Sequence, residues 1–372
     1  MKVAIIHEWL DGYAGSERVL EQLLLLYPQA ELFAVCDFLP AAERGFLGGR
    51  VPTTSFIQRL PRARQWFRYY LGLMPIAVEQ FDLSAYDLVI SSSHAVAKGV
   101  LTGPGTLHVA YVHSPMRYAW DLQHQYLRQS RLDRGVKGLL TRWLLARLRA
   151  WDHASGARPD VIAANSAWIA GRIRKAWRRD SVVVHPPVDL DGFPFQPDKQ
   201  DHYVVASRLV PYKRIDLIAA AFARMPDRRL VIAGDGPEMA RVREAAAGAP
   251  NIAIRGRVPQ AELVALLQSA RAFVFAAEED FGIALVEAQA CGTPLVAFAR
   301  GGASDIVQPD ETGLLFPDQT AESIMAAVAR FESLSIAPAA CRANAERFSR
   351  AAFRARMQAL VEEALAARGG AA

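Results

Sequence analysis

Short runs of apolar, strand-forming residues alternate with stretches of helical periodicity along most of the chain, and this alternation limits the folds available to it. Strands that are apolar on both faces and bounded by turn residues are typical of parallel sheets covered by helices on each side. Twelve such runs, six in each half, are enough for two doubly wound α/β sheets. The predicted strands are 2–7, 31–36, 88–92, 108–113, 161–165, 182–185, 202–207, 229–233, 252–255, 272–276, 294–298 and 313–316.

A proline-rich segment separates the two sets of strands. Four prolines fall within residues 185–197, and proline continues neither a helix nor a central strand. The segment is therefore predicted to be a linker between two Rossmann-like domains, 1–186 and 187–349, with a cleft between them. Residues 350–372 are predicted to form a C-terminal helical segment with a long apolar stripe.

Composition excludes several classes of protein. With 52% apolar and 22% charged residues, the chain can build a sizeable core. Its three cysteines are far apart and form no CxxC pair, so neither a disulfide framework nor a cysteine zinc site is expected. No apolar run is long enough for a transmembrane helix, and the N-terminal apolar run is too short for a signal peptide. The expected location is the cytoplasm, free or attached peripherally to the inner face of the cell membrane.

The positive charge is concentrated in the first half. Residues 1–185 hold 23 Lys/Arg and 15 Asp/Glu, whereas the remainder has a net charge of −3. Residues 59–70 interleave four arginines with four aromatic residues, and residues 128–149 contain seven basic residues and one acid. This pattern favours an anionic membrane surface; an ordinary solvated basic face, with its aromatic residues in the core, is the alternative. Because no nucleic-acid-binding motif is present, nucleic acid is not an expected partner.

The segment from Glu278 to Pro294 has the most informative pattern. It starts where a predicted strand ends and runs into a helix, and ligands of open parallel sheets bind at that end of the strands. Gly282 would let a diphosphate approach the backbone amides at the helix start. Glu279 and Glu287, eight positions apart, could contact opposite ends of a nucleotide sugar. The alternative is that both are ordinary solvated charges.

A second segment places two cations in one loop. Arg208 and Lys213 follow the first strand of the second half, and two fixed cations suit a diphosphate leaving group whose charge grows as its bond to the sugar breaks. A solvated basic loop is the alternative. The Gly234-Asp235-Gly236 turn is a common strand-to-helix connection.

Three weaker signals accompany these. His113 ends a first-half strand, where it either faces a ligand or is structural. Gly15 could bring the backbone close to a ligand, and Ser16 is predicted to cap the following helix. Arg257 and Val258 follow a strand and could reach a nucleotide base.

Together these residues resemble the retaining glycosyltransferases of family 4, which have the GT-B fold. Glu279 and Glu287 resemble their E-x7-E motif, and Arg208 and Lys213 resemble their diphosphate-binding cations. The first-half segments 7–10, 91–94 and 113–121 resemble the WbaZ-like mannosyltransferase branch of bacterial surface-polysaccharide assembly. The resemblance covers roughly residues 1–350.

The resemblance implies a catalytic group of four residues. Arg208 and Lys213 would hold the donor diphosphate and stabilise its departure. Glu279 would contact the hydroxyls of the transferred sugar, and His113 would lie near its reacting face.

It also implies a set of donor-binding positions. They would supply backbone amides to the sugar and phosphates, a carboxylate to the ribose and contacts to the base: Gly15, Arg257, Val258, Phe281, Gly282, Ile283 and Glu287. Three positions depart from the family pattern, because Ala14, Ser207 and Arg214 stand where glycines are common.

The resemblance implies transfer of a sugar with retention, most directly mannose from GDP-mannose, to a lipid-linked oligosaccharide acceptor. The alternatives are a UDP-sugar donor on the same fold, and a non-catalytic subunit that binds a sugar nucleotide. Neither a metal ion nor another cofactor is expected, because Arg208, Lys213 and a helix N-terminus could neutralise the leaving group. The C-terminal segment 350–372 is expected, by resemblance, to return to the first domain.

Overall fold

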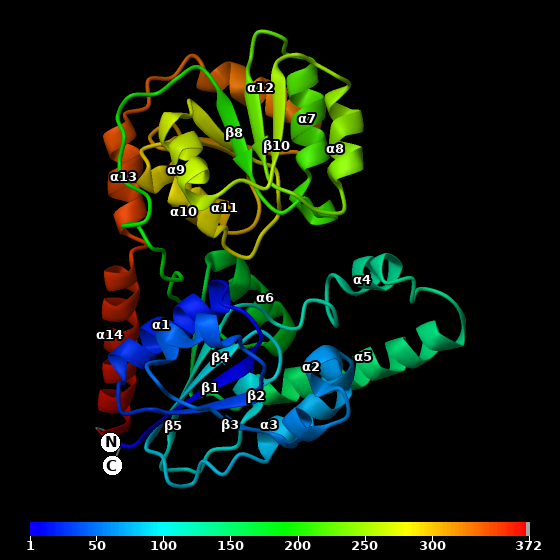
Figure 1. The fold of residues 1–372 in the computed structure, drawn as a ribbon. Helices are drawn as coiled ribbons and strands as arrows, with labels where there is room; N and C mark the ends of the chain where they lie inside the picture. Colours follow the sequence, from blue (N-terminus) through cyan, green and yellow to red (C-terminus); the bar gives the residue numbers. More distant parts are fainter. Residues whose placement is uncertain (370–372) are drawn as a thin grey trace. The chain divides into compact units, whose positions relative to one another are not determined.

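A computed structural model describes residues 1–369, and these form two compact units (Figure 1). Unit 1 contains Met1–His185 and the described residues from Phe353 onward, and unit 2 contains Pro186–Ala352. Residues 370–372, the end of the predicted C-terminal segment, lie outside the described residues. No helix among residues 1–369 combines the length and apolar character needed to cross a bilayer.

Unit 1 is built on a seven-stranded sheet in the order β3-β2-β1-β4-β5-β6-β7, with every ladder parallel. Its strands are β1 (Val3–Leu10), β2 (Glu31–Asp37), β3 (Thr53–Thr54), β4 (Leu88–Ser93), β5 (Leu107–Val112), β6 (Val161–Ala164) and β7 (Val182–Val183). Its α-helices are α1 (Gly15–Leu26), α2 (Ala63–Trp66), α3 (Met74–Glu79), α4 (Gln123–Gln129), α5 (Gly135–Ser155) and α6 (Ala167–Trp177), together with the part of α14 (Arg350–Gly369) from Phe353 onward. Its 3-10 helices are η1 (Ala41–Leu47), η2 (Phe56–Arg59), η3 (Phe67–Leu73) and η4 (Ala97–Gly99).

The sheet of unit 1 is buried on both faces. Successive β1 residues alternate between two apolar clusters, with Ile5 in one and Ile6 in the other. The first cluster takes its cover from α1 and from Phe353 and Met357 of α14 (Figure 1). The second cluster is covered by α3 and by the C-terminal half of α5. Cover on both faces explains why these strands read as nearly continuous apolar runs.

Unit 2 is built on a six-stranded sheet in the order β10-β9-β8-β11-β12-β13, again with parallel ladders. Its strands are β8 (Tyr203–Ala206), β9 (Leu230–Ala233), β10 (Ile252–Gly256), β11 (Ala272–Phe275), β12 (Leu295–Phe298) and β13 (Gly313–Phe316). Its helices are η5 (Pro211–Lys213), α7 (Ile215–Ala223), α8 (Met239–Ala246), α9 (Gln260–Ser269), α10 (Ile283–Ala290), α11 (Ala303–Ile306), α12 (Ala321–Phe331) and α13 (Pro338–Glu346).

The proline-rich segment is part of the core of unit 2. Val188 donates a backbone hydrogen bond to the carbonyl of Phe348 (2.9 Å), and Leu190 and Phe193 are buried in the same apolar cluster as Phe348. Further along, Lys199 donates from Nζ to two backbone carbonyls and to the hydroxyl of Thr293. The segment therefore runs along unit 2 and is held there by buried side chains.

The fold class predicted from the sequence is confirmed, since both sheets are parallel and covered on both faces. All twelve predicted strands are present, and the structure adds the two-residue strand β3. Several strand boundaries differ from the prediction, most of all the end of β1. β1 runs to Leu10 with Glu8 fully buried inside it, whereas the sequence pattern ends the strand at His7.

Candidate functional site

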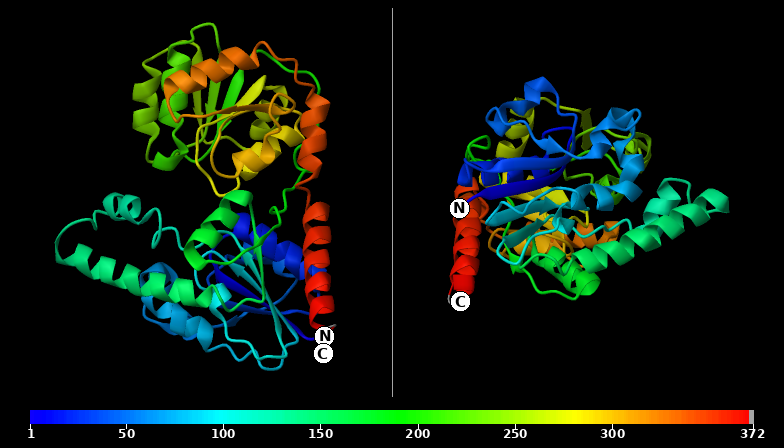
Figure 2. Two further views of the ribbon diagram at one scale, coloured as in Figure 1. Left: turned by 180° about the vertical axis from the view of Figure 1, so that it is seen from behind. Right: turned by 90° about the horizontal axis from the view of Figure 1, so that it is seen from below.

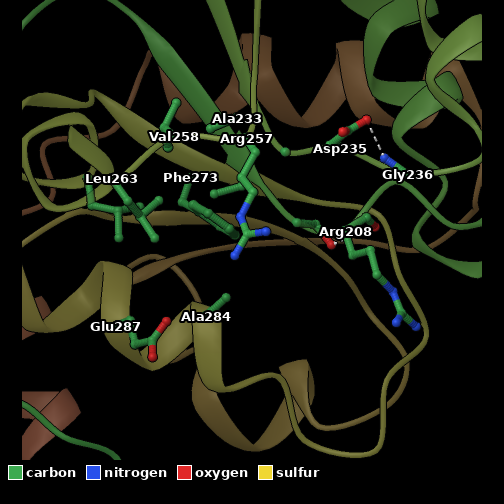
Figure 3. A pocket seen from close by; sticks show the side chains of 14 residues that line it. Arg208, Ala233, Asp235, Gly236, Arg257, Val258, Leu263, Phe273, Ala284 and Glu287 are labelled. Atoms are coloured by element: carbon green, nitrogen blue, oxygen red, sulfur yellow. Dashed lines mark hydrogen bonds between the residues drawn. The ribbon is translucent and has the colours of Figure 1, made fainter. Parts of the chain in front are cut away.

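The loops that follow β8, β9 and β10 enclose one side of a cavity of about 530 Å³ in unit 2 (Figure 3). Residues of β11, α9 and α10 form the other side. The cavity is lined by Ala206, Ser207, Arg208, Ala233, Gly234, Asp235, Gly236, Arg257, Val258, Leu263, Leu267, Phe273, Ala284 and Glu287. This is the C-terminal edge of a parallel sheet at the point where the strand order reverses, the usual ligand position in such sheets.

Four of the residues predicted to bind a donor line this cavity. Arg257 extends into it from the loop after β10, and Glu287 reaches it from α10 (Figure 3). Arg208 stands on the rim as an exposed side chain, and Val258 is half-buried beside Arg257. Leu263, Leu267 and Phe273 supply an apolar wall between the charged groups. A cavity with an apolar wall, two cations and two carboxylates, those of Asp235 and Glu287, suits a base, a phosphate group and a sugar hydroxyl.

The Arg208 loop is held by the turn after β9. The backbone N–H of Leu209 donates to the carbonyl of Asp235 (2.9 Å). Gly234 has a φ of +145°, and a Cβ there would lie 1.8 Å from the carbonyl oxygen of Ser207. Only glycine fits at this position. The Gly-Asp-Gly turn, which the sequence marked as a common connection, therefore shapes the cavity.

Lys213 and Glu279 meet outside the cavity lining. They come from the loops after β8 and β11, and Lys213 Nζ forms an ion pair with Glu279 Oε1. Both side chains are mostly buried, with exposed fractions of 15% and 19%. The ammonium also lies 5.6 Å from the ring centroid of Phe275, within cation–π distance. Two residues predicted to act on the same donor are thus in direct contact.

The loop that carries Glu279 rests on a glycine pair that the sequence analysis missed. Gly301 has a φ of +80°, and a Cβ there would lie 2.2 Å from the carbonyl oxygen of Glu279. A Cβ on Gly302 would lie 2.3 Å from the Cα of Phe281. Phe281 itself is buried and packs edge-on against Phe348. In the sequence, the two adjacent glycines shortly after the predicted strand 294–298 could have indicated that the backbone of another loop comes very close here.

Gly282 is the N-cap of α10, with a φ of +100°. Ile283 begins the helix, so its amide is among those without an intrahelical partner. The positive end of the helix dipole therefore faces the loop between Glu279 and Phe281. The carboxylate of Glu279, the ammonium of Lys213 and the N-terminus of α10 therefore lie at the same edge of the sheet.

In unit 1, His113 follows β5 and Gly15 follows β1 at the same edge of the sheet. The ring of His113 shares a hydrogen bond with the hydroxyl of Ser92 (2.9 Å). Burial, with the nearby His94 and His7, lowers the pKa of His113 to about 3. The imidazole is therefore neutral near pH 7 and can donate or accept one hydrogen bond from each ring nitrogen.

Gly15 begins α1 with Ala14 at the N-cap. The prediction that Ser16 caps this helix was wrong, because Ser16 lies inside the first turn. Glu17 caps the start of the helix instead, because its carboxylate accepts a hydrogen bond from the N–H of Ala14 (3.0 Å). The same carboxylate pairs with the ring of His7 (3.2 Å). Burial raises the pKa of Glu17, but the hydrogen bond and charge of His7 outweigh it and lower this pKa to about 2.

Glu8 lies in segment 7–10, for which the sequence predicted a family resemblance but no role for this residue. Its fully buried carboxylate accepts five hydrogen bonds from the loop after β4. The donors are the hydroxyl of Ser93 and the backbone N–H groups of His94, Ala95, Val96 and Ala97. Burial opposes ionisation, yet His94 and the backbone donors lower the pKa of Glu8 below its ordinary value. Glu8 thereby fixes the loop that carries His94 beside His113.

Residues 190–348 match the family described as "Glycosyl transferases group 1". This part of the chain is therefore similar to that family. The cavity and the Lys213–Glu279 pair both lie within the matched residues.

Two curated relatives share sequence with the chain. A D-inositol 3-phosphate glycosyltransferase of Mycobacteroides abscessus is 38% identical over 162 residues, covering 38% of this chain and 36% of that protein. A GDP-mannose-dependent alpha-(1-6)-phosphatidylinositol monomannoside mannosyltransferase of Mycolicibacterium smegmatis is 31% identical over 204 residues, covering 46% and 53%. The matches thus span about a third to a half of the length of these relatives.

The chain also matches solved structures over nearly its whole length. The Anabaena protein HepE, solved in complex with UDP, superposes with a TM-score of 0.66 at 17% identity. The superposition covers 98% of this chain and 100% of that one. At this identity the likeness establishes the fold, and with the two parallel sheets it confirms the GT-B class.

The candidate catalytic residues fall into both units. Arg208, Lys213 and Glu279 belong to unit 2, and His113 belongs to unit 1. Within residues 1–369, no three or more His, Cys, Asp or Glu side chains are grouped so that they could hold a metal ion. Metal-independent catalysis stays a prediction.

Proposed function

We propose that the chain is a retaining mannosyltransferase that moves mannose from GDP-mannose to a lipid-linked saccharide in bacterial surface-polysaccharide synthesis. The observation that carries the proposal is the cavity in unit 2, with Arg208 and Arg257 on one side and Glu287 on the other. Its size and mixed lining suit a nucleoside diphosphate. Val258 and Arg257 would contact the base, and Glu287 would accept hydrogen bonds from the ribose.

The sugar and diphosphate would occupy the loop region next to this cavity. Arg208 and Lys213 would bind the diphosphate, with the first-turn amides of α10 from Ile283 as further donors. Glu279 would accept hydrogen bonds from the sugar hydroxyls. Because Glu279 already pairs with Lys213, the two charges hold each other in place before the donor arrives, which reduces the reorganisation required during reaction.

The reaction requires one bond to break and one to form at the anomeric carbon. The bond from that carbon to the diphosphate oxygen breaks, and the acceptor oxygen bonds to the same face of the sugar. The acceptor proton passes to the departing phosphate. Arg208 and Lys213 would stabilise the growing negative charge, and neutral His113 would orient the sugar by a hydrogen bond. No step in this scheme needs a metal ion.

Support for the donor and acceptor comes from the relative named as a GDP-mannose-dependent mannosyltransferase, whose name also gives a phosphatidylinositol mannoside as its acceptor. A lipid-linked acceptor is presented at a membrane, so we place the reaction at the inner face of the cell membrane. The proposed partners are therefore GDP-mannose, a lipid-linked saccharide and an anionic membrane surface.

A thermal-shift panel of GDP, GDP-mannose, UDP, UDP-glucose and ADP tests the donor. Specific binding raises the melting temperature by mass action, so GDP and GDP-mannose should give the largest shifts. Arg257→Met should abolish the shift, whereas Arg243→Met, an exposed change on α8, should leave it intact. A shift selective for uridine nucleotides would refute GDP-mannose as the donor and leave the fold assignment unchanged. Absence of any shift would favour a chain that does not use sugar nucleotides.

A further inference from the structure

The hairpin formed by α4 and α5 carries an unusual exposed surface. Figures 1 and 2 show α5 extending away from the sheet of unit 1, with a loop at its far end that connects it to α4. Four large apolar side chains in this half are exposed, at fractions from 60% to 74%: Val136, Leu139, Leu140 and Trp143. Their spacing of three and four residues places them on one face of the helix.

The opposite face of α5 is the one that packs. Gly138, Leu145 and Leu148 are buried there, and Leu145 and Leu148 belong to the core of unit 1. The exposed apolar residues are therefore not part of the face that holds α5 on the protein. Aliphatic and aromatic side chains would not gather on a water-exposed face without a partner to cover them.

The hairpin is held in its shape by several contacts. Arg142 donates to the backbone carbonyl of Asp133 (2.8 Å), and Arg149 donates to the side chain of Gln123 (2.6 Å). A Cβ on Gly138 would lie 2.8 Å from the carbonyl oxygen of Leu132, so the connection packs closely against the helix. The apolar face is thus presented by a built element.

A second exposed apolar group adjoins α5. A Cβ on Gly72 would lie 2.9 Å from a terminal methyl of Leu144, so η3 contacts α5. Tyr69, Leu73 and Ile76, in and just after η3, are exposed. Two segments that are far apart in the sequence and touch at Gly72 and Leu144 thus each carry exposed apolar side chains.

Cations surround the apolar face. Arg131, Arg134, Lys137 and Arg147 are all exposed, and Arg147 lies 5.3 Å from the ring centroid of Trp143. Asp133 is the one acidic residue between positions 123 and 151. A second copy of the chain would place the same cations against each other across a symmetric interface, which disfavours self-association. Nucleic acid would match the charge, but it offers no apolar surface to cover the leucines.

We propose that this surface, the N-terminal half of α5 with residues 66–76, inserts into the interface of an anionic bilayer. The apolar side chains enter the acyl boundary, and the flanking arginines and Lys137 contact the lipid phosphates. The inference rests on the proposed function in one respect, since a lipid-linked acceptor requires the protein at a membrane. It deepens that proposal by naming the segment that binds the bilayer.

Vesicle flotation of the full chain tests the proposal. Vesicles with phosphatidylglycerol should bind at least about tenfold more strongly than pure phosphatidylcholine, because each cation near the surface adds attraction. The triple variant Leu139→Ser/Leu140→Ser/Trp143→Ser should lose about a hundredfold in partitioning. The control Leu25→Ser/Val51→Ser/Leu101→Ser, which removes exposed apolar side chains of other elements, should bind like the wild type. The charge variant Arg134→Gln/Lys137→Gln/Arg147→Gln should lose the preference for anionic vesicles.

The following outcomes would contradict the proposal. Equal binding to both kinds of vesicle, or no binding, would refute an anionic bilayer as the partner. Equal loss of binding in the control variant would show that this face is not the one used. If light scattering shows a wild-type dimer that the triple variant abolishes, the face binds a second copy. The GDP thermal shift of each variant separates this test from that of the donor site, because a failed donor proposal leaves flotation unaffected.

Discussion

Lys213 and Glu279 form an ion pair although 66 residues separate them in the sequence. The pair exists because β8 and β11 are adjacent parallel strands whose following loops emerge at the same sheet edge. Each side chain therefore depends on the other for its position. A donor diphosphate would bring a second anion to Lys213, which could then be shared between carboxylate and phosphate.

Replacing Lys213 with Met should reduce kcat/KM for transfer by about a hundredfold or more, because one preorganised donor to a developing anion typically contributes 10²–10³ in rate. It also leaves the mostly buried Glu279 without its partner, so GDP should bind more weakly. Initial rates with GDP-mannose and the GDP thermal shift measure the two effects. Arg243→Met is the control. A Lys213→Met enzyme with wild-type kcat/KM would remove Lys213 from the proposed mechanism.

Gly301→Ala should destabilise unit 2 by about 3 kcal/mol, from the cost of a positive φ and the overlap with the carbonyl of Glu279. Gly171→Ala in α6 is the matched control. A Cβ at Gly171 would meet nothing within 4 Å, so that change should stabilise the protein by about 0.5–1 kcal/mol. Urea denaturation compares the two variants. Equal stabilities would mean that the Glu279 loop does not rest on Gly301 as described.

Stability should decrease as the pH falls from about 6.5, because of His108 in β5. Burial lowers the pKa of His108 to about 4. Between pH 6.5 and 4 the unfolded chain binds a proton there that the folded chain excludes, so folding loses free energy in this window and no more below it. The loss from this group is about 3 kcal/mol.

Denaturation at pH 7, 5 and 4 measures this effect. His108→Gln should flatten the dependence in the window, whereas His124→Gln, an exposed change, should not. His113, with its pKa lowered to about 3, adds to the loss in the same direction. A wild-type protein as stable at pH 4 as at pH 7 would contradict the assignment of both imidazoles.

Lys98→Met should destabilise unit 1 by about 3–5 kcal/mol. Lys98 Nζ lies 2.6 Å from Asp152 Oδ1, and both side chains are buried. The indole N–H groups of Trp120 and Trp177 donate to the other carboxylate oxygen, so the variant leaves a buried carboxylate without its cation. Lys98→Met/Asp152→Asn should recover part of the loss. Thermal denaturation of the single and double variants measures the coupling, and simple additivity would argue against a coupled pair.

The strands could be predicted because hydrophobic periodicity is a local property, and here it agrees with the fold in all twelve predicted strands. β3 was missed because two threonines have no period to detect. The end of β1 was misplaced because a glutamate usually marks the end of a buried strand. Glu8 is tolerated there only because five donors from a loop about 85 residues away satisfy its carboxylate.

The same distinction between local sequence patterns and long-range contacts applies to the candidate site. The sequence by itself determined which residue types are proposed to carry the chemistry, namely the Arg208/Lys213 cations, the Glu279/Glu287 carboxylates and the glycine before α10, since their spacing relative to strand ends is local. Only the tertiary structure decided that Lys213 pairs with Glu279 and that Gly234 and Gly301 shape the loops. It also decided that the apolar face of α5 stays exposed. Contacts between distant segments and the covering of a helix face depend on which elements the sheets bring together, and no local pattern encodes that.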